Sequence, residues 1–150
     1  LEALRTRPEE IPLSLRQQLY EGSIYGGMVL GIASTVFGHK MGYYLSEAFH
    51  VPHGFACAVF LPELFRLAQT EMPDKLQALC NELGYTDSYL VQLFRDLTEA
   101  DIPPIPEATL DFLIESWRGN SSFAITPGDF DEETQRDVFR RTLKVVSPQG

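Results

Sequence analysis

Apolar residues in the first part of the chain recur at helical spacing. Between residues 13 and 30 they fall at three- to five-residue intervals, at Leu15, Leu19, Ile24 and Met28. This pattern predicts a helix over that range that packs one broad face inward. The chain shows neither regular alternation of apolar and polar residues nor an Asn-Gly or Asp-Gly hairpin signal, so we do not expect strands.

The same periodicity, with helix start and stop signals, predicts further helices. The expected ranges are 33–48, 52–69, 74–84, 86–97, 107–117 and 131–143. Pro52 suits the first turn of its helix, Gly84 a helix C-cap, and Thr86 or Asp87 an N-cap. Residues 102–106 form a proline-rich break, and residues 119–129 a polar loop. We therefore predict one all-α domain, a helical bundle that spans the whole chain.

The longest uncharged run, residues 22–38, approaches the length of a membrane span. It contains Gly22, Gly26, Gly27 and Gly31 at four-residue spacing, together with serine and threonine. This spacing lets another backbone or a ligand approach closely. Because so many glycine and hydroxyl residues do not suit a membrane span, we expect a buried, tightly packed helical pair and no membrane partner.

Composition narrows the class of protein. The 150 residues are 44% hydrophobic and 22% charged, which is typical of one well-cored globular domain. There are 12 Lys and Arg against 21 Asp and Glu, a net charge of -9, so nucleic acid and anionic membranes are poor partners.

Cys57 and Cys80 lie in apolar stretches without metal-site spacing, which suggests buried thiols in a reducing cytoplasm. The chain begins with Leu1 rather than Met, and its first ten residues lack the basic-then-apolar layout of a secretory signal. We therefore expect a fragment of a longer chain.

All three histidines, His39, His50 and His53, fall within fifteen residues. Neutral imidazole is the commonest metal ligand, and two imidazoles from different helices can hold an ion at their junction. Two ligands alone are too few for a complete site, and Glu47 nearby is interpreted as a solvated acid. Clustered histidines also serve as core or surface groups, so composition and spacing leave both interpretations open.

Residues 27–62 read GMVLGIASTVFGHKMGYYLSEAFHVPHGFACAVFLP. This segment resembles the iron-containing, group III alcohol dehydrogenase family, in which the His of a Pro-His-Gly turn follows an earlier His by fourteen residues. The matching positions, without gaps, are Gly27, Met28, Ala33, Ser34, His39, Leu45, Ser46, Pro52, His53, Gly54, Leu61 and Pro62. Residues 125–143 are similar to the closing helix of the family. The resemblance implies the all-α C-terminal domain of the dehydroquinate synthase-like architecture.

The resemblance also implies a metal centre. Members pair an N-terminal nucleotide-binding α/β domain with a helical domain that holds a divalent metal through one Asp and three His. His39 and His53 match two of these ligands, whereas the Asp-x-x-x-His helix that carries the other two has no counterpart here. The N-terminal domain is thus expected to lie outside this chain, which alone would be inactive. The implied cofactors are Fe2+, with Zn2+ also compatible, and NAD or NADP bound mainly by the missing domain.

One position departs from the family pattern. Members commonly carry a second His four residues after the first ligand, and this chain has Tyr43 there. Helical geometry points Tyr43 toward the same pocket as His39, so its phenol could relay a proton. A packing role, like that of Tyr44, is equally open. His50 lies where the family varies and is interpreted as a loop or surface residue.

The spacing of His39, Pro52, His53 and Gly54 leads to a functional hypothesis. The protein would be a metal- and NAD(P)-dependent alcohol dehydrogenase or aldehyde reductase, acting on a small alcohol or aldehyde as a cytoplasmic homodimer. The metal would act as a Lewis acid. The alternatives are an inactive helical domain used for oligomerisation or interaction, a polyol-specific relative, and a dehydroquinate synthase-like cyclase. The Pro-His-Gly spacing favours the alcohol dehydrogenase branch.

Overall fold

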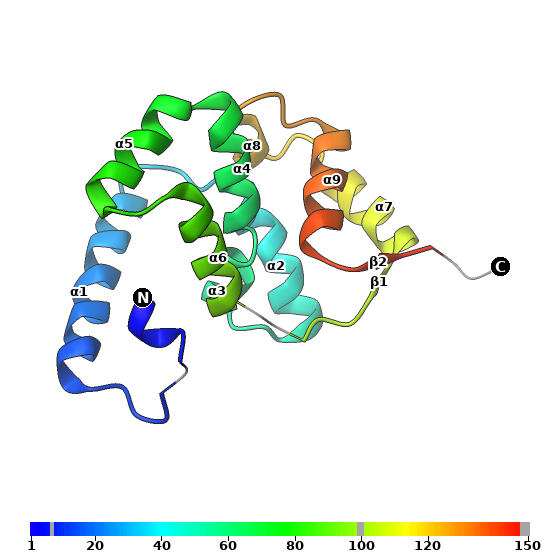
Figure 1. Ribbon diagram of the computed structural model, residues 1–150. Coiled ribbons are helices and arrows are strands. Elements are labelled where there is room, and N and C mark those ends of the chain that lie inside the picture. The colour runs from blue at the N-terminus through cyan, green and yellow to red at the C-terminus, as the bar shows by residue number, and fades with distance from the viewer. Residues whose placement is uncertain (7, 99–100, 148–150) are drawn as a thin grey trace. The chain divides into compact units, whose positions relative to one another are not determined.

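The computed structural model describes residues 1–6, 8–98 and 101–147, and helices dominate it (Figure 1). The predicted all-α class is confirmed. The chain divides into two compact units, residues 1–35 and residues 36–150. The first unit contains a short 3-10 helix, η1 (Glu2–Leu4), and helix α1 (Leu13–Leu30). Among the described residues, no helix has both the length and the apolar character that crossing a membrane requires.

Helix α1 has the predicted bounds. No residue of α1 is buried, and Ile24 and Met28 of the expected inward face are exposed. A Cβ atom on Gly22 or Gly26 would meet no atom within 4 Å. The expected tight pair would join α1 to a helix of the second unit, and it stays a prediction. Apolar side chains are spread around α1 rather than gathered in one stripe, and η1 is the only other helix in the described part of its unit.

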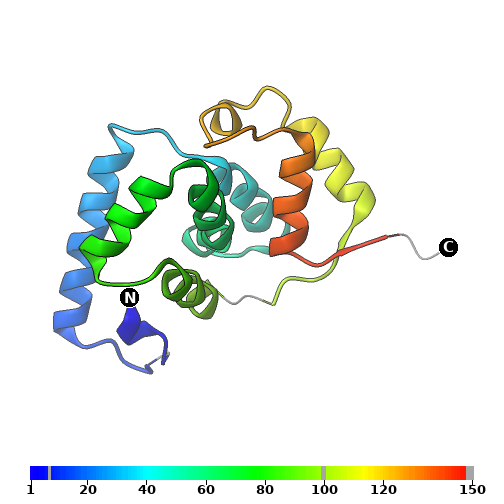
Figure 2. The same ribbon diagram turned by 45° about the horizontal axis from the view of Figure 1, so that its top comes forward.

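The second unit carries the remaining elements. They are α2 (Phe37–Phe49), α3 (His53–Ala58), α4 (Leu61–Glu71), α5 (Pro73–Leu83), α6 (Asp87–Thr98), β1 (Ile105–Pro106), α7 (Glu107–Ser116), α8 (Ser121–Ala124), α9 (Glu132–Thr142) and β2 (Val145–Val146). The two short strands, absent from the prediction, pair in parallel with Ile105 opposite Val145. Both views place α9 beside α7 (Figure 1 and Figure 2), and these helices are in contact.

The predicted helix over residues 52–69 is broken in the structure. Helix α3 ends at Ala58 and α4 begins at Leu61, with Pro62 in its first turn. Proline has no N–H to donate and its ring clashes with the preceding helical turn, so it starts a new helix here. The predicted caps are confirmed at Gly84, whose φ is 70°, and at Thr86, whose Oγ1 accepts from the Tyr89 N–H.

The core of the second unit is built on one face of α2. Phe37, Met41 and Leu45, spaced by four residues, are fully buried, as expected for one helical face. They belong to a cluster with apolar residues of α3, α4, α7 and α9. A smaller cluster joins α5 to α6 and contains Cys80, which is buried as predicted, whereas Cys57 is half-buried. The large core fixes α2, the helix on which the site is built.

Candidate metal centre

Two glycines set the distance between α2 and α3. A Cβ on Gly42 would lie 2.8 Å from the carbonyl oxygen of Ala56, and a Cβ on Gly38 would lie 3.4 Å from that of Cys57. Gly38 and Gly42 are one helical turn apart, so both face the same neighbour. The absence of side chains there lets the backbone of α3 lie directly on α2, at a distance that no other residue permits at position 42.

The face of α2 beside these glycines carries polar and aromatic side chains that meet His53. The Nε2 atoms of His39 and His53 are 3.2 Å apart, and Nδ1 of His53 is 3.4 Å from the Ser46 hydroxyl. The Tyr43 ring stacks on His53 with centroids 5.0 Å apart and meets His39 edge-on at 4.9 Å. Helical spacing alone predicts that His39 and Tyr43 share a face, and the structure has this arrangement.

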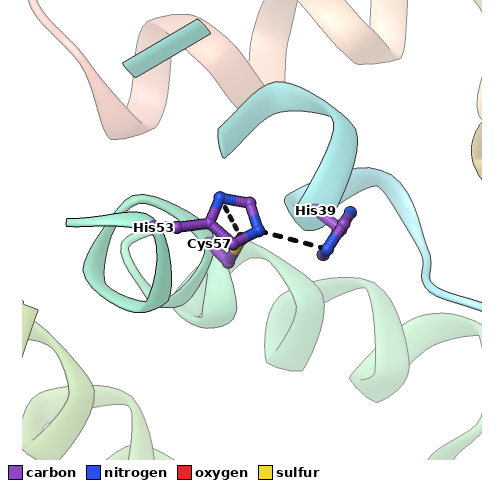
Figure 3. Close-up of side chains that lie close together, drawn as sticks. All are labelled: His39, His53 and Cys57. Atoms are coloured by element: carbon purple, nitrogen blue, oxygen red, sulfur yellow. Dashed lines mark hydrogen bonds between the residues drawn. The ribbon is translucent and has the colours of Figure 1, made fainter. Parts of the chain in front are cut away.

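A third donor atom adjoins the two imidazoles (Figure 3). Sγ of Cys57 lies 3.6 Å from Nε2 of His53. One ligand atom each from His39, His53 and Cys57 can be chosen so that all lie within 4.8 Å of one another. Sequence reasoning missed Cys57, because it was interpreted only as a buried thiol. The signal that could have found it is its position four residues after His53, on the same helical face.

Burial sets the charge state of two of these groups. Desolvation lowers the pKa of His39, and the neighbouring His53 lowers it further. His39 is therefore held as a neutral imidazole with a free lone pair, the form that binds cations. Burial raises the pKa of the Cys57 thiol, which stays protonated in the absence of a cation. Cation binding at this cluster would use the imidazole lone pair directly and would require Cys57 to lose its proton.

His50 lies outside this cluster, at the end of α2. It is exposed and has the left-handed backbone conformation, with a φ of 55°. Tyr44, the neighbour of Tyr43, packs instead against Phe49 and Phe139. The structure thus brings together His39, Tyr43 and His53 and leaves His50 at the surface, where the sequence places it.

Comparisons with known proteins bear on this arrangement. Residues 4–100 match the model of the C-terminal part of the Fe-containing alcohol dehydrogenase family. The chain is 28% identical over 99 residues to 1,3-propanediol dehydrogenase of Klebsiella pneumoniae, which covers 66% of this chain and 25% of that protein. It is 30% identical over 74 residues to maleylacetate reductase 1 of Rhodococcus opacus, which covers 49% and 21% respectively. The alignments thus span a quarter or less of these relatives. No solved structure matches the chain.

Proposed function

Because the chain belongs to the Fe-containing alcohol dehydrogenase family, as its C-terminal part, we propose that it supplies the metal-binding part of an NAD(P)-dependent alcohol dehydrogenase or aldehyde reductase. The observation that carries this proposal is the pair of imidazole nitrogens, from His39 and His53, that face each other at 3.2 Å. The two relatives are a dehydrogenase and a reductase by name, which supports the same class of reaction.

The donor set fits a divalent cation. Two nitrogens at 2.0–2.1 Å from a tetrahedral metal stand about 3.3 Å apart, close to the distance between the two Nε2 atoms. In this proposal His39 and His53 hold the cation through Nε2. Nδ1–H of His53 then donates to the Ser46 hydroxyl, and this hydrogen bond fixes the tautomer and orients the ring. Fe2+ is the family expectation, and imidazole suits Zn2+ equally well.

The proposed reaction divides the work between the cofactors and this chain. When bound, the cation supplies Lewis-acid polarisation of the substrate oxygen, and NAD or NADP, bound mainly outside these 150 residues, supplies or accepts the hydride. Tyr43 moves the proton at its phenolic oxygen. Its ring stacks on His53 while 43% of the residue remains exposed, so Tyr43 adjoins the imidazole pair and is also open to solvent.

A coupled assay tests this proposal. Protein expressed from its complete gene and loaded with Fe2+ or Zn2+ is mixed with NADH or NADPH and a panel of small aldehydes. We expect cofactor oxidation by the wild type and by His50→Ala, the exposed control, and a loss of at least about tenfold in His39→Ala and His53→Ala. Absence of turnover with every aldehyde, cofactor and metal would overturn the proposal.

A second candidate function is an inactive helical domain that serves oligomerisation or interaction. Tyr43, at a position where the family resemblance leads us to expect His, favours it. This role would be identified if the protein self-associates with and without metal and turns over no substrate. In the enzyme proposal, the substrate is a small alcohol or aldehyde and the protein is a cytoplasmic homodimer, a location with which the two free thiols agree.

A further inference from the structure

The candidate metal centre holds a donor that the family pattern does not account for. Cys57 follows His53 by one turn of α3, and its Sγ lies 3.6 Å from Nε2 of that histidine. We propose that Cys57 is a third protein ligand, so that this chain alone presents a His2Cys site for a zinc-class divalent cation. This inference rests on the proposed cation-binding role of His39 and His53.

Two edges of the donor triangle have the lengths of tetrahedral coordination. Metal–nitrogen bonds of 2.0–2.1 Å and a metal–sulfur bond of 2.3 Å place two nitrogens about 3.3 Å apart, and a nitrogen and a sulfur about 3.6 Å apart. The corresponding distances here are 3.2 Å between the imidazoles and 3.6 Å from Cys57 to His53. The third edge, from Cys57 to His39, is within 4.8 Å and is the one that cation binding would shorten.

All three donors lie on helices whose separation is fixed by packing. His39 is on α2, and His53 and Cys57 are four residues apart on α3, so the two latter side chains share one face. Contact between Gly42 and the Ala56 carbonyl holds these helices together. Donors held by helices rather than by loops have little freedom to move apart, which favours a pre-organised site.

The donor types select the cation. A thiolate with two imidazoles suits Zn2+, whereas carboxylate and water suit the harder cations. These three donors leave coordination positions for ligands from outside this chain, such as the Asp and His that the family resemblance implies. On binding, the Cys57 S–H bond breaks, the metal–sulfur bond forms and the proton passes to solvent. His53 is exposed, so a cation can reach the site from the surface.

Cobalt substitution tests this ligand set without reference to activity. Protein expressed from its complete gene is stripped with a chelator and titrated with Co2+ under anaerobic conditions. A cobalt–thiolate bond produces a near-ultraviolet charge-transfer band, separate from the visible ligand-field bands of cobalt. We expect both in the wild type. Cys57→Ser and Cys57→Asp should lose the charge-transfer band and keep the ligand-field bands, and Cys57→Ser should bind Zn2+ at least about tenfold more weakly.

Cys80→Ala is the matched control, because Cys80 is buried in the separate cluster with Leu76 and Leu90. It should keep both sets of bands. Ligand-field bands without a charge-transfer band in the wild type, or a charge-transfer band that survives in Cys57→Ser, would overturn ligation by Cys57 and leave the proposed function intact. Failure of the wild type to bind cobalt at all would overturn both proposals.

Discussion

Gly42 lies directly against the carbonyl oxygen of Ala56, and this contact determines how closely α2 and α3 approach. A Cβ atom at position 42 would be 2.8 Å from that oxygen and 2.9 Å from the Ala56 carbonyl carbon. Both are backbone atoms, which cannot rotate away as the end of a long side chain can. The imidazoles of His39 and His53 meet across the same pair of helices, so the glycine contact and the candidate metal centre are mechanically linked.

Gly42→Ala should therefore destabilise the protein and separate the two histidines. Overpacking of this kind costs about 1–3 kcal/mol, against a gain in helix propensity of up to about 1 kcal/mol. We expect a lower midpoint of urea unfolding and a weaker affinity for the divalent cation. Gly54→Ala is the control, since a Cβ there meets nothing within 4 Å. Equal unfolding midpoints for the two variants would show that the contact does not limit helix approach.

Phe139→Ala should be one of the most destabilising single changes. Phe139 is fully buried, and its ring lies 5.9 Å from that of Trp117 and 6.3 Å from that of Phe60. Truncation of such a residue costs about 3–5 kcal/mol through lost burial and the cavity left behind. Phe112→Ala, at a residue that is 71% exposed, should change stability by less than about 0.5 kcal/mol. Denaturant titration of both variants checks this contrast.

Asp131 should make the free energy of unfolding vary with pH in the acid range. Its side chain accepts from the Thr134 N–H at 2.8 Å, and hydrogen bonds from Thr134 hold the pKa of Asp131 below its ordinary value. A carboxyl group whose pKa is lower when folded stabilises the protein above its unfolded pKa, and this contribution disappears as pH falls through the folded pKa.

The variant Asp131→Ala should thus be less stable than the wild type at neutral pH. The gap should close as pH falls below about 3.9, the ordinary pKa of Asp. Asp131→Asn caps the helix without titrating in this range, so it supplies the control. Thermal melts from pH 2 to pH 7 measure the three proteins, and a gap that is constant with pH would contradict a role for the ionised carboxylate.

The proposed relay role of Tyr43 is tested by Tyr43→Phe. Removal of the phenolic hydroxyl leaves the aromatic stacking on His53 possible but removes the group that moves the proton. We expect kcat to fall about 10²- to 10⁴-fold with metal content unchanged. Tyr44→Phe, on the side of α2 that packs against Phe139, should retain activity. If Tyr43→Phe is as active as Tyr44→Phe, Tyr43 is a packing residue.

Local sequence signals predicted the helices well where one residue decides the outcome. The end of α5 at Gly84 and the start of α6 after Thr86 follow from such signals. Pro62 also indicates the break between α3 and α4, but the apolar residues on both sides of it resemble one continuous helix. The pairing of β1 with β2 was not predictable in this way, because two residues per strand leave no periodic pattern.

The candidate site was partly predictable for a different reason. His39 and Tyr43 share a face because helical spacing requires it, whereas the approach of His53 depends on the packing of α3 on Gly42. Ile24 and Met28 illustrate what a periodic apolar pattern leaves open, because it identifies a helix without identifying what covers it. Cys57 was missed because residue type was weighed without its spacing from His53.

The metal content of the protein tests the central claim most directly. Elemental mass spectrometry on protein expressed from its complete gene and purified anaerobically would compare the wild type with His39→Ala, His53→Ala and His50→Ala, each checked for folding by circular dichroism. We predict a bound divalent cation in the wild type and in His50→Ala, whose site is exposed and separate, and its loss from the other two. Equal metal content in all four proteins, or none in any after reconstitution with Fe2+ or Zn2+, would contradict the account.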